Sequence, residues 1–164
     1  METTLKITKE SAVKAHEEAS AKGKLLLENL FGKSTFSKDI KDVIGNFDDV
    51  LRYHGIDAFD FLNSLKGLTE DEMAYRQLKL IVSAYNENAI PDYDDSNQVK
   101  YEPRFKLSSS GVGFSYDDCD GWRTLSVSGS RLVYLNYENM KDSVSKFLDI
   151  YKKYITNNNT QSPC

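Results

Sequence analysis

The spacing of apolar residues changes along this chain of 164 residues, and that change sets the fold class. Up to about residue 88, apolar residues recur every three or four positions, which is typical of helices that bury one face. From residue 101 to 135 they alternate with polar residues, which is typical of short strands. Helical spacing returns from Met140 to Ile155. The sequence therefore predicts an α+β protein.

Capping residues and glycines divide the N-terminal half into about five to six predicted helices. Thr8 and Ser20 can each accept a hydrogen bond at a helix start, and Gly32 can end the second helix in a left-handed conformation. A third segment begins at Ser37 and is interrupted at Gly45. These signals are local, so they predict helix boundaries without reference to the rest of the fold.

The clearest helix signal is the run Thr69-Glu70-Asp71-Glu72. A Thr followed three residues later by a Glu forms a capping box, which satisfies free N–H groups at a helix start. Apolar residues at helical spacing then continue to about residue 88. Shorter helices are expected to end before Gly55, where His54 suits a helix C-terminus, and near Gly67.

The C-terminal half predicts a small antiparallel sheet of three to four strands, with a C-terminal helix over one face. A three-residue loop around Gly129 is expected to join the last two strands. The run Asp117–Gly121 indicates an acidic turn, because Asp and Gly favour turns. Asn136 can cap the final helix. The predicted strands are 101–107, 112–116, 123–127 and 131–135.

Turn-forming residues between the two halves give the best candidate boundary. We expect a helical region over 1–90, an acidic linker over 91–100, a sheet-plus-helix region over 101–155 and a polar tail over 156–164. The two halves can equally form one compact domain.

The charge balance argues against nucleic acid as a partner. Residues 1–90 carry 12 basic and 15 acidic side chains, and residues 91–164 carry 9 and 10, so neither half is basic. Proteins that grip phosphates usually show a basic stripe. The apolar runs are far too short to span a membrane, and the N-terminus shows no targeting pattern, so we expect a cytosolic protein, or one released by lysis, without a membrane partner.

No metal or cofactor site is predicted. The run Asp117-Asp118-Cys119-Asp120-Gly121 is similar to part of a calcium loop, but Tyr116 and Val127 then fall at ligand positions 1 and 12. His16 and His54 have no paired spacing with a cysteine, which a zinc site would need.

No catalytic signature appears either, so the sequence predicts a protein that is not an enzyme. The glycines near 111–113 form neither a nucleophile elbow nor a dinucleotide loop. A small enzyme with Cys119 as nucleophile, paired with His16 or His54, stays open as an alternative.

Eight aromatic residues between 93 and 137 are interleaved with arginines and lysines. Tyr, Trp and Arg are enriched at protein–protein interfaces, so Tyr116, Trp122, Arg123 and Arg131 are the candidate contact residues. The rings can instead form the two faces of the sheet, and Arg131 can simply fix a hairpin.

Nucleic-acid binding is the second hypothesis for the same strands, because aromatic rings interleaved with cations can stack bases. The cations that would serve it are Lys100, Arg104, Lys106 and Arg123.

Several segments together resemble a family of small uncharacterised proteins of tailed phages and prophages of Bacteroides-like gut bacteria. The Gly129-Ser130-Arg131-Leu132 corner is the most recognisable of them. The other matching segments are 7–12, 25–32, 36–40, 74–87, 100–105 and 147–151.

The resemblance implies a viral origin and a virion component or accessory protein that acts on other proteins. The partner is then another phage or host protein, with self-association also open, and the location is the host cytoplasm or the virion. The resemblance implies no catalytic residue.

Overall fold

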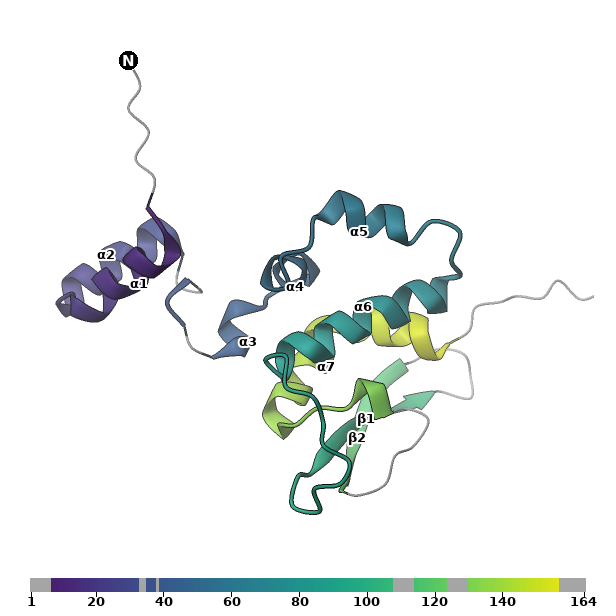
Figure 1. Cartoon of the computed structure of the whole chain (residues 1–164). Coiled ribbons are helices and arrows are strands. Elements are labelled where there is room, and N and C mark those ends of the chain that lie inside the picture. Colours follow the sequence, from purple (N-terminus) through teal and green to yellow (C-terminus); the bar gives the residue numbers. More distant parts are fainter. Residues whose placement is uncertain (1–6, 33–34, 38, 108–113, 124–129, 157–164) are drawn as a thin grey trace, which may run out of the picture. The chain divides into compact units, whose positions relative to one another are not determined.

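The computed structural model describes residues 7–32, 35–37, 39–107, 114–123 and 130–156. Within these residues the chain forms seven α-helices, a two-stranded antiparallel sheet and a 3-10 turn, so the predicted α+β class is confirmed (Figure 1). The chain divides into two compact units, Met1–Ile44 and Gly45–Cys164. The division therefore falls at Gly45, and the segment 91–100 lies inside the second unit.

The first two helices of the first unit begin after the cap residues that the sequence predicts, Thr8 and Ser20. The Ser11 N–H donates to Thr8 Oγ1 at 3.3 Å, the Gly23 N–H donates to Ser20 Oγ at 3.4 Å, and Gly32 has a φ of 83°. The third helix begins later than expected, because Asp39 rather than Ser37 is its N-cap. The helices are α1 (Lys9–Glu18), α2 (Ala21–Phe31) and α3 (Ile40–Val43).

A polar contact and a ring stack join α1 and α2 to the segment that follows them. His16 Nε2 lies 3.0 Å from Glu28 Oε1, and the His16 ring stacks on Phe36 at 4.2 Å between centroids. Among the described side chains of α1 and α2, only that of Ala12 is buried. The hairpin of α1 and α2 therefore has almost no apolar core of its own.

The second unit is built around two long helices that pack against each other, α6 and α7 (Figure 1). The N-cap of α6 is Thr69, as predicted, and Glu72 Oε2 accepts hydrogen bonds from the Thr69 N–H at 2.9 Å and hydroxyl at 3.0 Å. Asn136 caps α7, also as predicted. The helices of this unit are α4 (Phe47–Tyr53), α5 (Ala58–Ser64), α6 (Glu70–Tyr85) and α7 (Tyr137–Ile155).

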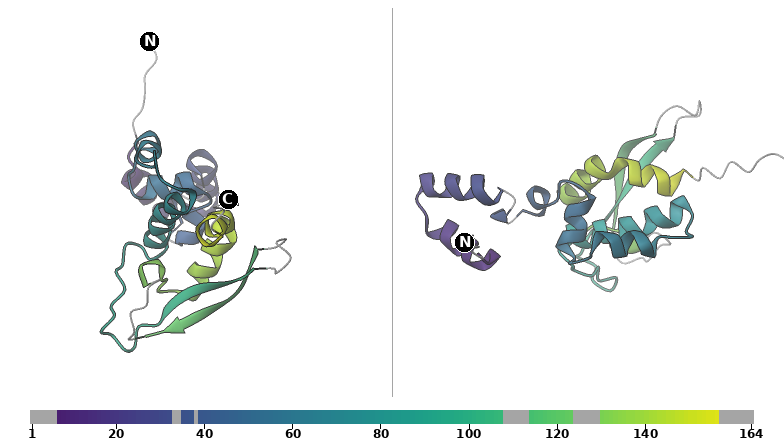
Figure 2. Two further views of the ribbon diagram at one scale, coloured as in Figure 1. Left: turned by 90° about the vertical axis from the view of Figure 1, so that its right-hand side faces the viewer. Right: turned by 90° about the horizontal axis from the view of Figure 1, so that it is seen from above.

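The sheet is a hairpin of β1 (Lys100–Leu107) and β2 (Phe114–Trp122), which lies to one side of α6 and α7 (Figure 2). Lys100 lies opposite Trp122, and the register shifts between Arg104 and Phe105, so that Asp117 has no opposite residue. Helix α7 contacts both strands, and the Phe105 ring lies 5.1 Å from that of Tyr151. The predicted cover of the sheet by the last helix is therefore confirmed.

The predicted sheet of three to four strands is not confirmed, since the described residues form two strands. The run Asp117–Gly121 is not a turn but part of β2, where Arg104 and Lys106 on the opposite strand pair with its carboxylates. The segment 124–129, which holds the loop around Gly129 and most of the predicted strand 123–127, lies outside the described residues.

The predicted strand 131–135 is wrong. Ser130–Leu132 forms the 3-10 turn η2, and a single bridge joins Tyr134 to Tyr101, with both N–H···O distances at 2.9 Å. The 3-10 turn leaves only Tyr134 to pair with β1. On the opposite edge of this segment Asn86, the C-cap of α6, donates from Nδ2 to the Val133 carbonyl and accepts at Oδ1 from the Leu135 N–H, both at 2.9 Å. A side chain thus takes the backbone groups that a further strand would use.

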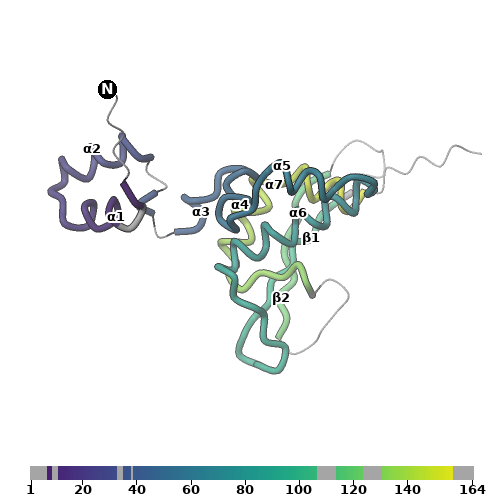
Figure 3. The backbone as a smooth tube through the Cα atoms, turned by 45° about the horizontal axis from the view of Figure 1, so that its top comes forward, coloured from purple at the N-terminus to yellow at the C-terminus, as the bar shows by residue number. Residues whose placement is uncertain are grey.

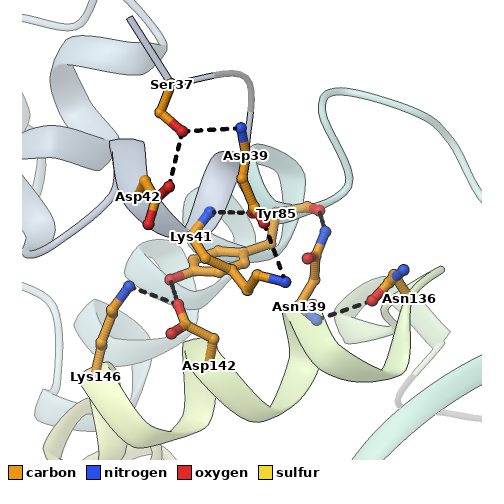
Figure 4. A network of polar contacts seen from close by, with 9 residues as sticks. All are labelled: Ser37, Asp39, Lys41, Asp42, Tyr85, Asn136, Asn139, Asp142 and Lys146. Carbon is orange, nitrogen blue, oxygen red and sulfur yellow. Dashed lines mark hydrogen bonds and ion pairs between the residues drawn. The ribbon is translucent and has the colours of Figure 1, made fainter. Parts of the chain in front are cut away.

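Asn86 lies where two distant parts of the chain meet. Figure 3 traces the chain from the end of α6 through 86–99 to β1, and later back from η2 to α7. A second link lies beside it (Figure 4): the Tyr85 hydroxyl donates to Asp142 Oδ2 at 2.7 Å, and Asn139 Nδ2 donates to the Tyr85 carbonyl at 2.8 Å. Lys146 pairs with the same Asp142 oxygen at 2.6 Å. Polar contacts therefore fix the end of α6 to α7.

Tyrosine hydroxyls form a buried cluster between this junction and the sheet. The Tyr134 hydroxyl lies 2.7 Å from Ser143 Oγ and 2.5 Å from the Tyr151 hydroxyl. Burial raises the pKa of Tyr134 to about 12, although the hydrogen bonds with Ser143 and Tyr151 act in the opposite direction. Burial also raises the pKa of Tyr151 well above its ordinary value.

We expect the substitution Asn86→Ala to lower the free energy of unfolding by about 2–4 kcal/mol, because it leaves two inward-facing backbone groups without partners. Urea denaturation measures this loss. Asn97→Ala, at an exposed asparagine, is the matched control and should stay within about 0.5 kcal/mol of the wild type. Equal stability of the two variants would contradict the role of Asn86.

We also expect stability to fall as the pH rises from about 10 to about 12. The unfolded chain releases the Tyr134 proton near its ordinary pKa of about 10, whereas the folded chain holds it to about 12. Stabilisation is therefore complete below pH 10 and is lost through the folded pKa. Urea midpoints at a series of pH values measure the slope, and Tyr134→Phe should reduce it, while the part due to Tyr116 and Tyr151, whose pKa values are also raised, should stay. An unchanged slope in that variant would count against the assignment.

Candidate functional site

The aromatic residues expected to serve as contacts pack against one another. None of the eight rings between residues 93 and 137 is exposed, and Tyr134 is fully buried. The Trp122 ring stacks on Tyr93 with centroids 6.0 Å apart, and Phe105 stacks on Phe114 at 4.8 Å. These rings therefore mainly pack against other side chains of the second unit.

Tyr116 and Trp122, two of the four predicted contact residues, are half-buried in β2. Burial raises the pKa of Tyr116 to about 12, and the nearby Cys119 and Tyr137 add to the shift. The Tyr116 hydroxyl and Trp122 Nε1 are buried without a hydrogen-bond partner among the described residues. The other two predicted residues, Arg123 and Arg131, are exposed. The four do not form one exposed aromatic surface.

Lys100, a predicted nucleic-acid contact, is fully buried. Its Nζ donates to the carbonyls of Arg123 at 2.8 Å, Gln98 at 3.0 Å and Asp95 at 3.4 Å, and it lies 5.7 Å from the centre of the Tyr93 ring. This ammonium group ties the segment before β1 to the end of β2, and it is not available to a phosphate.

Arg104 and Lys106, two further predicted nucleic-acid contacts, face acids on β2. Arg104 lies within 3.5 Å of Asp117, Asp118 and Asp120, and Lys106 pairs with Asp117. Lys106 and then Arg104 hold the pKa of Asp117 below its ordinary value. Of these cations only Arg123 is both exposed and without a paired acid that the structure describes, so the strands offer no basic stripe.

The carboxylates of Asp117–Asp120, which are similar to part of a calcium loop in sequence, are the ones that pair with Arg104 and Lys106. In the described part of the chain, no group of three or more His, Cys, Asp or Glu side chains converges in a way that could hold a metal ion.

Cys119 lies in β2, and both histidines form their hydrogen bonds with other residues. His54 Nε2 contacts the Leu80 carbonyl at 2.9 Å, and His16 pairs with Glu28 within the first unit. Burial raises the pKa of the Cys119 thiol, Asp118 and Asp120 add to the shift, and Arg104 opposes it. A raised thiol pKa leaves less thiolate at neutral pH, which is the reverse of what a nucleophile needs.

The exposed apolar side chains lie on helices. On α5, Phe59 is 71% exposed and Leu62 is 64% exposed, while Phe61 and Leu65 are buried in a cluster with Leu51. The sequence pattern carried a signal for this, because Phe59 and Phe61 are about 200° apart around a helix and cannot share a face.

The first unit has an exposed apolar face as well. Leu25, Leu26 and Leu30 of α2 are each more than half exposed, and no side chain of α2 is buried. Each unit thus exposes apolar side chains on a helix.

In comparisons with known proteins, no family model, curated protein or solved structure matches the chain. The resemblance to phage proteins therefore stays a prediction. Among the described residues, no helix is both long and apolar enough to cross a lipid bilayer.

We expect Cys119 to react slowly with iodoacetamide at pH 7, because its thiol pKa is raised. The variant Cys164→Ser leaves Cys119 as the single thiol, and a short cysteine peptide is the reference. The midpoint of the rate against pH should lie above that of the peptide, whose thiol has the ordinary cysteine pKa of about 8.5. A midpoint below the peptide's would restore Cys119 as a candidate nucleophile.

Proposed function

We propose that this chain is a non-enzymatic protein–protein interaction module and that α5 carries the main contact. The observation behind the proposal is the exposure of Phe59 and Leu62, at 71% and 64%, on a helix whose other side is core. Large apolar side chains exposed side by side commonly mark binding surfaces. We call Phe59 and Leu62 the α5 pair.

The helix that carries the α5 pair is anchored by buried side chains and by a capping carboxylate. Phe61 and Leu65 anchor the helix beside Leu51, and the Phe61 ring lies 5.3 Å from that of Phe47. The Asp57 carboxylate fixes the start of α5 by accepting from the N–H groups of Phe59 at 2.9 Å and Asp60 at 3.1 Å. A preformed surface costs little entropy when a partner binds.

The charge around α5 suits a basic partner. Residues 45–72 carry seven acidic and two basic side chains. One of the basic residues, Arg52, already pairs with Asp49 at 2.7 Å. An acidic surface around apolar anchors favours a protein segment that combines apolar side chains with lysine or arginine.

The resemblance to phage proteins supplies the biological part of the proposal. We propose a virion-associated or accessory role, with another phage or host protein as the partner, in the host cytoplasm or the virion. The strand residues Tyr116, Trp122, Arg123 and Arg131 are a weaker candidate surface, because the two rings are half-buried.

Photo-crosslinking tests this proposal. We expect a p-benzoylphenylalanine placed at Phe59 to capture one basic protein in cells of the natural host. The same group placed at Ser145, on the exposed side of α7, is the control and should not capture it. Equal capture at both positions, or none at Phe59, would contradict the proposal.

For the captured partner, we expect the double variant Phe59→Ala and Leu62→Ala to bind at least about tenfold more weakly, since each exposed anchor should contribute about 1 kcal/mol or more. Folding stability should change by less than about 0.5 kcal/mol for each exposed site. Calorimetry measures the affinity, and the affinity should also fall with salt. Unchanged affinity would place the contact elsewhere.

A further inference from the structure

A pocket of about 180 Å³ lies in the second unit between β1, η2 and the last turn of α7. Its wall is mostly apolar, with Phe105 from β1, Leu132 from η2, and Tyr151 and Ile155 from α7. Glu102 and Tyr154 add a carboxyl and a hydroxyl group to the lining. A cavity of roughly 150 Å³ holds a benzene ring, so this pocket fits one ring with a short arm.

The apolar wall is fixed before any ligand arrives. The Phe105 ring is held between Phe114 at 4.8 Å and Tyr151 at 5.1 Å, measured between centroids. Tyr151 is in turn held by the contact of 2.5 Å between its hydroxyl and that of Tyr134. Side chains that are already ordered lose little entropy on binding.

Glu102 is the acidic member of three side chains with a buried polar atom that lacks a hydrogen-bond partner among the described residues, the others being Tyr116 and Trp122. Its Oε1 atom is buried and accepts no hydrogen bond from the described residues. Burial raises the pKa of the Glu102 carboxyl, Asp120 adds to the shift, and the Trp122 side chain acts in the opposite direction. An unsatisfied buried acceptor costs free energy, and a donor supplied by a ligand would recover it.

Two further features favour a cation over an anion or a neutral group. Tyr154 and Ile155 belong to the last turn of α7, whose free carbonyl groups carry the negative end of the helix dipole, and Lys152 and Lys153 of the same turn offset part of that potential. Phe105, Tyr151 and Tyr154 also line the pocket, and an aromatic ring attracts a cation that lies over its face.

We propose that this pocket binds a small primary amine as its ammonium ion, with the nitrogen on Glu102 and the hydrocarbon part against Phe105, Leu132 and Ile155. The site is distinct from the α5 pair and does not depend on the proposed function. No bond is made or broken in binding.

Benzylamine is the probe, and benzyl alcohol is its neutral match in shape. We expect both to be followed by chemical shifts of the Leu132 and Ile155 methyl groups in the full chain. Benzylamine should bind saturably, at least about tenfold more tightly than benzyl alcohol, which is the difference that one charge-assisted hydrogen bond commonly makes. Absence of saturable shifts up to about 20 mM, a range that covers weak ligands, would overturn the proposal.

Two variants assign the effect to the pocket. Glu102→Gln should bring the two affinities within about twofold of each other, whereas Glu138→Gln, at an exposed acid of α7, should leave the preference intact. Ile155→Trp should fill the cavity and abolish binding of both probes, and its site is exposed enough to accept the ring. A preference that survives Glu102→Gln, or binding that survives Ile155→Trp, would overturn the assignment.

Discussion

The second unit depends on the hydrogen bonds that the Asn86 side chain makes with the backbone of Val133 and Leu135. A two-stranded hairpin is marginally stable alone, so it must be held against other elements. Asn86 fixes the segment that bridges to Tyr101 in β1, and this segment leads directly into α7. One amide at the end of α6 thus fixes the sheet, η2 and the last helix relative to one another.

Charged side chains on the sheet serve mainly its own stability. Lys100 is buried and bonded to three carbonyls, and Arg104 and Lys106 pair with the acids of β2. Satisfied in this way, these cations offer little to a phosphate backbone, whose affinity comes from neutralising charges. Glu102 is the carboxyl group of the sheet that keeps a buried oxygen without a partner among the described residues, and the Tyr116 hydroxyl shares that state.

Helix boundaries could be predicted from the sequence because their signals are local: Thr8, Ser20, Thr69 and Asn136 are N-caps, as expected. Strands depend on distant residues. The alternating pattern of 131–135 could not show that Asn86 takes its backbone groups. The sequence of Asp117–Gly121 also could not show that Arg104 and Lys106 lie on the opposite strand. Which residues face each other depends on the register between two strands, and a single segment does not contain that information. For the same reason aromatic density on the strands suggested a surface, whereas the rings mainly contact each other.

The two exposed apolar faces differ in what supports them, and this difference decides between them as binding sites. The hairpin of α1 and α2 buries little beyond Ala12, and helices of this length are marginal without tertiary packing. A partner that covered Leu26 and Leu30 would spend part of its binding free energy on ordering the hairpin. Helix α5 is instead anchored by Phe61 in the core of its own unit. A partner of equal area therefore gains more affinity on α5, which is why we propose the principal contact there.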